Sequence, residues 1–251
     1  MAAVSAPRTR AAVRTAVVWD YLRAALAALD TGSGALRVLD AGGGSGGFAV
    51  PLAQLGHSVT VVDPSPDSLA ALERRVAETG TSTRVVALQG DAAGLPELVP
   101  AGSYDVVLCH SVLEVVDDPQ EAMRAIAHAL RPGGVASVLA ANRIAAVVSR
   151  VAAGRLAEAR RLLSDPAGST GDGDPLVRRF TLDELQPLLT QVGLQPRTVH
   201  GCRIFTDIVP PALLDGDPQV IDDLLALERA AAERPDYLAV ATQLHVLADR
   251  D

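Results

Sequence analysis

The segment 38–50, VLDAGGGSGGFAV, places four glycines within five positions, directly after an apolar run that ends in an acid. Its acid is Asp40, and its glycines are Gly42, Gly43, Gly44 and Gly46. Residues 37–39 have the character of a strand and residues 48–55 that of a helix. Glycine permits a tight turn and lets backbone N–H groups at a helix N-terminus approach a ligand closely. The segment therefore predicts an α/β chain with a ligand-binding turn, since a ligand-free turn would leave the cost of these glycines, about 0.5–1 kcal/mol each in regular structure, without a reason.

Two nucleotide-containing cofactors compete for this turn. The pattern G-x-G-x-x-G, with Gly42, Gly44 and Gly47, could cradle the pyrophosphate of a dinucleotide. The pattern D-x-G-x-G-x-G, with Asp40, Gly42, Gly44 and Gly46, resembles motif I of class I S-adenosylmethionine (SAM) methyltransferases. Asp40 favours the second pattern, because a carboxylate suits the ammonium of a methionine group and would repel a pyrophosphate.

Strand-like and helix-like segments alternate along the chain. Strands are expected at 57–63, 84–88, 104–110 and 135–140, after the first strand at 37–39, with helices between them at 64–78 and 119–130. Two further strands are expected at 194–205 and 237–248, with a helix at 218–232. This alternation predicts a Rossmann-like, doubly wound, mostly parallel sheet of seven strands.

The chain is expected to form a single domain, 1–251, in four parts. A cap helix lies within 1–30, the cofactor-binding core spans 36–142, an insertion or lid spans 143–180, and the C-terminal part of the sheet spans 181–251. The insertion is predicted to contain one amphipathic helix at 144–163, followed by a polar, mobile loop at 164–175. The C-terminal part begins with a capping box, Thr181 to Glu184.

Composition narrows the class of protein. The net charge of −8 argues against indiscriminate binding of nucleic acid, although the segment 143–203 carries nine arginines against six acids. These arginines could equally be solvated helix faces. Cys109 and Cys202 stand far apart, so neither a metal site nor a disulfide framework is expected. With no apolar run long enough to span a membrane, the chain is expected to be cytoplasmic.

Acids follow two more of the expected strands. Asp63, followed by Pro64, ends the second strand 17 residues after Gly46, where Rossmann-like folds place a carboxylate for ribose hydroxyls. Asp91, with Ala92 beside it, follows the third strand, where SAM enzymes place an acid for the adenine amino group. Each acid alone could be a helix cap or a turn residue, but three acids at successive strand ends favour a cofactor.

Several motifs together resemble the class I SAM-dependent methyltransferases over about 36–142. They are VLDAGGGSG, VVDPSP, LQGDAAGLP, YDVVLCHSVLEVVDDP and LRPGGVASVLAANR. A closer resemblance is to the tRNA 5-carboxymethoxyuridine methyltransferases, through HSVLEVVDDP, HGCRIFTD, LLALERAAAERPDYLAVATQLHVLA and RTAVVW. The resemblance implies the class I methyltransferase fold, SAM as cofactor, and a tRNA carboxylate as acceptor.

The resemblance also implies which residues contact the cofactor: Arg14, Gly42, Gly43, Asp63, Asp91, Ala92 and His110. Arg14 would bind the methionine carboxylate as a bidentate fork. The sequence departs from the family in three places: a Lys-rich segment is here Arg178-Arg179, a His–Asp–Tyr is Thr206-Asp207-Ile208, and an Arg–Tyr is Thr242-Gln243. These departures fall where the family holds tRNA or the modified base.

The acceptor decides which residues act. A carboxylate is already ionised at pH 7 and needs only a cation to orient it, for which Arg203 is the first candidate and Arg143 the second. A hydroxyl needs a base, and His110 at the end of the fourth strand is the best-placed group. Arg203 could instead form a structural salt bridge, and His110 could be a hydrogen-bonding wall. Glu114, His128, His200 and His245 suggest no constellation.

Three functions follow from these observations. The first is a methyltransferase acting on a carboxylate of a modified tRNA wobble uridine or a similar acceptor. The second is a methyltransferase acting on a small carboxylic or hydroxylic metabolite, which the acidic composition favours. The third belongs to another class, an NAD-dependent oxidoreductase or a cofactor-binding module without catalysis.

Overall fold

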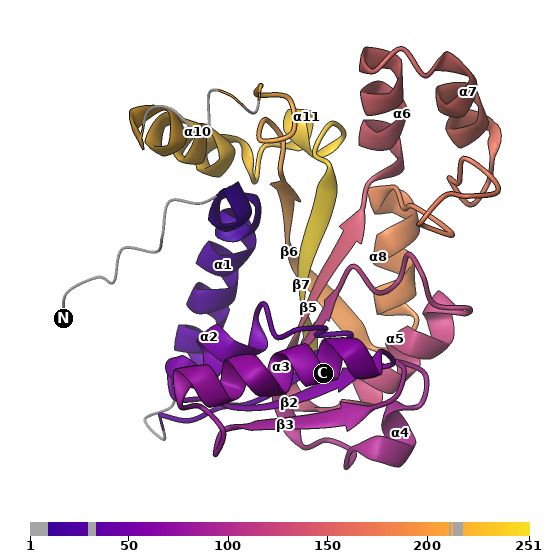
Figure 1. The fold of residues 1–251 in the computed structure, drawn as a ribbon. Helices are drawn as coiled ribbons and strands as arrows, with labels where there is room; N and C mark the ends of the chain where they lie inside the picture. The colour runs from indigo at the N-terminus through magenta and orange to yellow at the C-terminus, as the bar shows by residue number, and fades with distance from the viewer. Residues whose placement is uncertain (1–9, 30–33, 211, 213–217) are drawn as a thin grey trace.

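Seven strands form one sheet in the order β3-β2-β1-β4-β5-β7-β6 (Figure 1). The computed structural model describes residues 10–29, 34–210, 212 and 218–251. The strands are β1 (Arg37–Ala41), β2 (Ser58–Asp63), β3 (Val85–Gln89), β4 (Tyr104–His110), β5 (Leu130–Ala141), β6 (Leu194–Cys202) and β7 (Gln243–Arg250). The first five pair in parallel, and β7 runs antiparallel to both β5 and β6. The predicted doubly wound, mostly parallel sheet is confirmed.

Helices cover both faces of this sheet. α1 (Arg10–Leu29), α2 (Ala49–Gln54) and α3 (Pro66–Thr79) pack on one face. α4 (Leu95–Leu98), α5 (Pro119–Ala129) and α8 (Leu182–Thr190) pack on the other. α10 (Pro218–Ala231) packs against α1, and α11 (Pro235–Leu238) precedes β7. Apolar side chains therefore meet the sheet from both sides, as parallel sheets require.

The sequence of β4 is almost continuously apolar because the strand is buried on both faces of the sheet. Val106 and Leu108 are buried in the core beneath α2 and α3, whereas Val107 and Cys109 are buried in the core beneath α5. Alternate residues of a strand point to opposite faces, so a strand covered on both sides has no polar face. The central position fixes His110, the last residue of β4, at the carboxyl edge of the sheet.

The insertion contains two helices and not the single helix that the sequence predicts. Instead of one helix at 144–163, the structure has α6 (Arg143–Ala152) and α7 (Leu156–Ser164), which pack against each other (Figure 1). Gly154 between them has a φ of +72°, a conformation that a helix interior does not allow. An ion pair of 2.8 Å from Arg150 Nε to Glu158 Oε2 links the two helices.

Several other element boundaries were predicted wrongly. The helix after Pro119 ends at Ala129, one residue early, and the strand expected at 135–140 begins directly after it, at Leu130. The strand expected at 194–205 stops at Cys202, because Arg203 has a φ of +58°. The strand expected at 237–248 begins only at Gln243, since Pro235 opens the short helix α11. The predicted capping box of Thr181 and Glu184 is confirmed at the start of α8.

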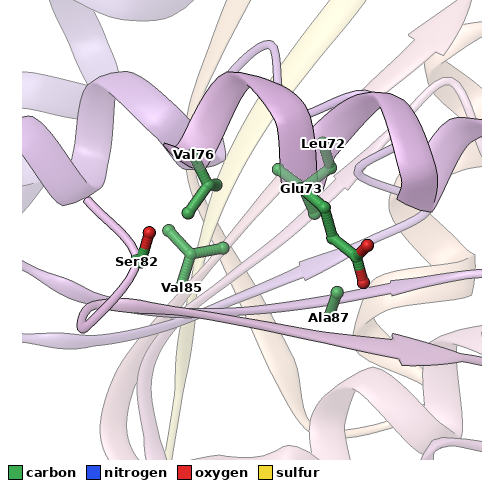
Figure 2. Close-up of a pocket in the computed structure, with 6 residues that line it drawn as sticks. All are labelled: Leu72, Glu73, Val76, Ser82, Val85 and Ala87. Atoms are coloured by element: carbon green, nitrogen blue, oxygen red, sulfur yellow. The ribbon is translucent and has the colours of Figure 1, made fainter. Parts of the chain in front are cut away.

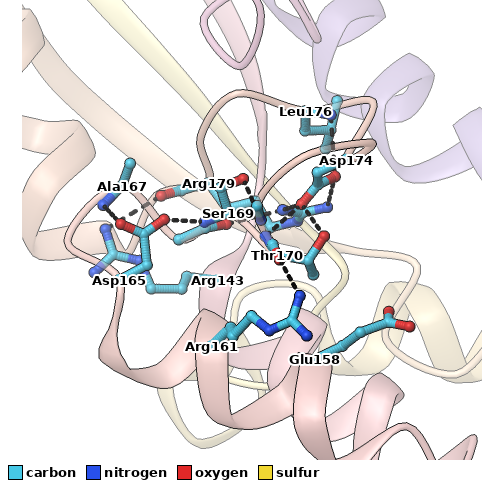
Figure 3. A network of polar contacts seen from close by, with 12 residues as sticks. Arg143, Glu158, Arg161, Asp165, Ala167, Ser169, Thr170, Asp174, Leu176 and Arg179 are labelled. Carbon is cyan, nitrogen blue, oxygen red and sulfur yellow. Dashed lines mark hydrogen bonds and ion pairs between the residues drawn. The ribbon is translucent and has the colours of Figure 1, made fainter.

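The polar segment after α7 is held by a network of side chains (Figure 3). Asp174 forms a nearly solvent-free ion pair with Arg179, with Oδ2 2.7 Å from Nη1, and also accepts from Thr170. Asp165 Oδ2 accepts from the backbone N–H of Ser169 at 2.8 Å. The hydrogen bonds from Arg179 hold the pKa of Asp174 well below its usual range. That segment 143–180 acts as a lid stays a prediction.

Candidate cofactor and acceptor site

Three parallel strands end side by side at the carboxyl edge of the sheet. Ala41 at the end of β1 pairs with Val62 of β2 and with Cys109 of β4. The glycine turn follows β1, Asp63 ends β2 and His110 ends β4, so the predicted cofactor residues share one edge. This is the edge at which open α/β sheets bind their ligands.

The glycine turn adopts conformations that other residues avoid. Gly42, Gly44 and Gly46 have φ of +72°, +54° and +79°. The backbone N–H of Gly42 donates to the carbonyl of Val62 at 2.7 Å, which ties the turn to β2. The spacing of these three glycines is G-x-G-x-G.

Positions 46 and 47 distinguish the two cofactor interpretations, because the SAM pattern requires glycine at 46 and the dinucleotide pattern requires it at 47. A β-carbon on Gly46 would lie 2.4 Å from Leu72 Cδ1 of α3, so a close packing contact excludes a side chain there. A β-carbon on Gly47 would meet no atom within 4 Å among the described residues, and Gly47 has no positive φ. The dinucleotide pattern requires a glycine at position 47, but the fold leaves room for a side chain there. The turn therefore matches D-x-G-x-G-x-G.

Asp40 is a buried acid that the protein leaves incompletely bonded. Its side chain lies under the turn, and Oδ2 has no hydrogen-bond partner in the described part of the chain. Burial, and then the charge of Asp63, raises the pKa of Asp40 to about 7. An orphaned buried carboxyl is costly unless a cation or donor arrives, which fits the ammonium of a methionine group.

Asp63 is oriented by the turn that it faces. Its Oδ2 accepts from the backbone N–H of Gly44 at 2.8 Å, and its Oδ1 accepts from that of Ser65 at 2.9 Å. Each carboxylate oxygen can accept a second hydrogen bond, so Asp63 can also bind a pair of ribose hydroxyls. Pro64 beside it is exposed.

Asp91 and Ala92 have structural roles in addition to any contact with a cofactor. Asp91 Oδ1 accepts from the backbone N–H of Gly94 at 2.8 Å and so stabilises the turn before α4. Ala92 belongs to the core beneath α5, with 4% of its surface exposed. Only the backbone of Ala92 can therefore contact a cofactor, whereas the carboxylate of Asp91 is exposed and has a free oxygen to offer.

Arg14 and Arg203 share one carboxylate. Asp207 binds Arg14 Nη2 through Oδ1 at 3.0 Å and Arg203 Nη2 through Oδ2 at 2.5 Å. Arg203 Nη1 also donates to Gln243 Oε1 at 3.3 Å, and Gln243 Nε2 donates to Ser111 Oγ at 3.1 Å. Within Thr206-Asp207-Ile208, Asp207 is the one residue that keeps the family pattern, whereas Gln243 departs from it. In the structure both residues bind Arg203, the guanidinium predicted to orient an acceptor carboxylate and called here the acceptor clamp.

The backbone at Arg203 is held in an uncommon conformation. Its φ of +58° is unfavourable for a residue with a long side chain, and Nε is buried without a partner among the described residues. The buried carboxylate of Glu228 accepts from the backbone N–H groups of Ile204, Phe205 and Thr206, which fixes the turn that follows. The sequence contained no signal for Glu228 beyond its place on an amphipathic helix. Strain of this kind is typical of residues that are positioned for a ligand.

His110 combines a bonded and an unbonded ring nitrogen. Nε2 lies 2.8 Å from Ser137 Oγ of β5, whereas Nδ1 is inaccessible to solvent and has no partner in the part of the chain that is described. The ring lies edge-on to Phe48, just after the glycine turn, with ring centroids 4.6 Å apart. Burial lowers the pKa of His110 to about 3, so the ring is neutral.

The second acceptor clamp considered from the sequence is engaged elsewhere. Arg143 Nη2 binds Glu184 Oε1 at 2.7 Å and the carbonyl of Pro166 at 2.7 Å, which ties α6 to α8. Arg178 donates to backbone carbonyls that follow β4, including Leu113, and Arg179 pairs with Asp174. These arginines connect the insertion to the core, and the role of Arg143 as a second clamp stays a prediction.

The partners of His110 were not predicted from the sequence. Ser137, His245 and His200 are buried together next to it, although the two histidines suggested no constellation in the sequence. Alternate residues of a strand point to the same face of a sheet. The strand expected at 237–248 could therefore have indicated which of its residues share a face with His245. Its pairing with His200 depends on the register between β6 and β7.

A surface hollow elsewhere does not belong to this site. It lies between α3 and the edge strand β3, and Leu72, Glu73, Val76, Ser82, Val85 and Ala87 line it (Figure 2). None of the glycines of the turn lines it. No cluster of three metal-ligating side chains occurs within the described ranges, and no helix described there is long and apolar enough to cross a membrane.

Comparison with known proteins agrees with the cofactor that the glycine turn and its acids indicate. Residues 39–138 match the model of a methyltransferase domain. A ubiquinone biosynthesis O-methyltransferase of Rhizobium leguminosarum is 34% identical over 79% of this chain and 74% of its own length. The chain belongs to the SAM-dependent methyltransferases. A SAM-dependent methyltransferase from Mesorhizobium loti has the same fold, with a TM-score of 0.60 and 23% identity over 92% of this chain and 97% of that one.

A second relative aligns with nearly the whole length of this chain. It is a tRNA 5-carboxymethoxyuridine methyltransferase of Escherichia coli, 29% identical over 96% of this chain and 89% of its own. SAM is the cofactor, and the family assignment overturns the alternative of an NAD-dependent oxidoreductase or a module without catalysis. The glycine turn, the orphaned Asp40 and the oriented Asp63 fit SAM.

Proposed function

We propose that this methyltransferase transfers a methyl group to a carboxylate oxygen of a modified tRNA wobble uridine or a similar acceptor. The observation that carries the proposal is Arg203, a guanidinium fixed by Asp207 and Gln243 at the carboxyl edge of the sheet. The nearly full-length similarity to the tRNA 5-carboxymethoxyuridine methyltransferase supports the same acceptor.

The proposed cofactor contacts divide by chemistry. The backbone of the turn (Gly42, Gly43, Gly44 and Gly46) would pack against the methionine part of SAM, with Asp40 facing its ammonium and Arg14 its carboxylate. Asp63 would accept the ribose hydroxyls, with Pro64 beside them, and Asp91 and Ala92 would contact adenine. His110 would close the site near the methyl group. Arg14 must then bind Asp207 and the methionine carboxylate together, which its two terminal nitrogens allow.

SAM supplies an electrophilic methyl group on a positively charged sulfur. The protein then has to bring the acceptor oxygen into line with that group, with the reacting atoms about 3–3.5 Å apart. A carboxylate is ionised at pH 7 and needs no base. A guanidinium binds a carboxylate through two parallel hydrogen bonds, which fixes its orientation as well as its position. Arg203 would supply that fork.

The proposal is tested by transfer of labelled methyl from SAM to bulk tRNA of the source organism. A methyl ester is cleaved by mild alkali, whereas methyl groups on ring carbons, ring nitrogens and ribose oxygens are not. Alkali-labile label in the tRNA supports the proposal. Absence of label from tRNA, with SAM binding confirmed by calorimetry, contradicts it.

A small metabolite with a carboxyl or hydroxyl group is the second candidate acceptor. The net charge is −8, and Arg178 and Arg179 are used inside the protein and not presented to a phosphate backbone. The similarity to a ubiquinone biosynthesis O-methyltransferase also fits this candidate. The salt dependence of acceptor binding separates the two, because contacts to several phosphates give a steep dependence and a small metabolite with few or no charges gives a shallow one.

A further inference from the structure

The two outer strands of the sheet, β3 and β6, differ in how well they are protected against pairing with another chain. β6 contains Pro196 and Arg197, and its register with β7 shifts between Pro196 and Thr198. Proline, charged side chains and bulges are features that keep an edge strand from pairing. β3, with the sequence VVALQ, has no proline and no charged residue, and its register with β2 is unbroken. β3 is therefore the outer strand that can accept a further strand.

The backbone groups of β3 face β2 and the outside of the sheet in turn. The N–H of Gly90 donates to the carbonyl of Asp63, at the end of β2, over 3.2 Å. Because successive residues of a strand direct their N–H and C=O groups to opposite sides, even-numbered residues here face β2 and odd-numbered ones face away. The residues with outward backbone groups are Val85, Ala87 and Gln89. No strand of the described chain pairs with that side.

Apolar side chains lie along both faces of this strand. On one face Val85 and Ala87 point toward α3, where they form part of the wall of a hollow of about 280 Å³ (Figure 2). On the other face the side chain of Val86 is 55% exposed. Leu98 of α4, also exposed, packs over the end of the strand, because a β-carbon on Gly90 would stand 2.4 Å from Leu98 Cδ1. A strand that continued the sheet here would cover apolar surface on both faces.

The charges at the two ends of β3 suit an antiparallel copy of the same strand. Arg84 directly precedes the strand and is exposed, whereas Asp91 and Glu97 follow it and are exposed. Two identical strands that pair in antiparallel order bring the basic start of each strand near the acidic end of the other. A parallel copy would instead place like charges side by side, which destabilises a strand pair. The antiparallel pair has twofold symmetry, so the same apolar patch meets its own counterpart.

We propose that β3 is a dimerisation strand, at which a second copy of this chain pairs its own β3 in antiparallel order. Two seven-stranded sheets then become one continuous sheet. The outward N–H and C=O groups of each strand, with Ala87 at the centre, bond to those of the other, and Val86 of each copy is covered. Arg203 follows β6, at the opposite end of the strand order, so this assembly does not depend on which acceptor the protein methylates.

Sedimentation equilibrium over a dilution series tests the assembly. The wild-type protein should reach twice the 26.0 kDa of one chain at high concentration and dissociate on dilution. Val86→Lys brings two like charges together in the dimer and should weaken it about a hundredfold. Val86→Thr keeps a β-branched side chain and should stay dimeric. Leu227→Lys, at a residue of α10 that is also 55% exposed, is the matched control and should stay dimeric as well.

Hydrogen exchange measured by NMR shows whether β3 itself forms the contact. In the dimer the N–H of Ala87 should exchange at least tenfold more slowly than in the Val86→Lys monomer, because only the dimer gives this group a partner. The N–H groups of Val86 and Leu88 face β2 and should be protected equally in both states. Circular dichroism checks that each variant is folded.

Two sets of results overturn the proposal. One is a wild-type protein that stays at 26.0 kDa over the whole dilution series. The other is a dimer that survives Val86→Lys, or one in which the N–H of Ala87 exchanges as fast as in the monomer, because the interface would then lie elsewhere. Loss of the dimer in Leu227→Lys to the same extent as in Val86→Lys would also overturn it, since net charge and not β3 would then control assembly.

Discussion

Gly43 lies directly against Asp40, so that a β-carbon on Gly43 would stand 2.6 Å from Asp40 Cγ. The contact explains why the turn has a glycine at a position without a positive φ. Any side chain there must displace either the buried carboxylate or the backbone that is proposed to contact SAM. Gly43 and Gly47, the two glycines of this segment without a positive φ, thus differ in the side chain that each position can accommodate.

We expect Gly43→Ala to weaken SAM binding at least tenfold, because the methyl group pushes the Asp40 carboxylate out of place. The measurement is isothermal titration calorimetry with SAM. Gly47→Ala is the matched control, since its β-carbon meets nothing within 4 Å in the described structure, and it should bind SAM as the wild type does. Equal affinities of the two variants would mean that Asp40 and Gly43 do not border the cofactor.

Asp63→Ala should abolish detectable SAM binding while leaving the fold intact. The substitution removes the proposed ribose acceptor and leaves the N–H groups of Gly44 and Ser65 without their partner, at a cost of about 1–3 kcal/mol of folding free energy. Calorimetry measures the affinity, and circular dichroism measures the fold. Glu73→Ala, at an exposed acid on α3, is the control. Unchanged affinity in Asp63→Ala would contradict the proposed cofactor contacts.

Local sequence was enough to predict where Asp40, the glycine turn and Asp63 lie in the fold. Asp40, the glycine turn and Asp63 are each positioned by the strand that ends beside them, so a pattern within a few residues determines their geometry. The partners of Arg203 and His110 depend on long-range register instead. Ser137 and His245 are 108 residues apart in the chain and meet only because β5 and β7 pair in one register. Gly154 shows a smaller failure, because one glycine inside an amphipathic pattern can either continue a helix or end it.

Arg203→Ala should leave SAM affinity unchanged and reduce methyl transfer to a carboxylate acceptor at least a hundredfold, because the acceptor loses its bidentate fork. Calorimetry and a labelled-methyl assay separate the two effects. Arg203→Gly removes the same guanidinium but accommodates the φ of +58° without strain, so it should be as inactive as the alanine variant. Recovery of activity in Arg203→Gly would show that strain in the backbone, and not loss of the clamp, inactivates the alanine variant.

Arg197→Ala is the matched control for the clamp. Arg197 lies on β6, six residues before Arg203, and pairs with Asp249 at 3.0 Å on the exposed surface. Its loss removes the same charge from the neighbouring part of the chain without touching the carboxyl edge. Activity in Arg197→Ala should stay within twofold of the wild type. A loss of activity equal to that of Arg203→Ala would point to overall charge and not to a positioned guanidinium.

The free energy of unfolding should fall as the pH falls from about 6.5 to about 4. The folded-state pKa values of His110 and His200 are about 3 and about 4, and that of His245 is also lowered, all through burial. In this window the unfolded chain takes up protons that the folded chain does not, so acid favours unfolding. Each fully titrating histidine contributes a slope of about 1.4 kcal/mol per pH unit. Urea unfolding at several pH values measures this slope. His245→Gln should reduce the slope by up to about 1.4 kcal/mol per pH unit, the contribution of one histidine. A stability that does not change between pH 6.5 and 4 would mean that the buried histidines are protonated in the folded protein.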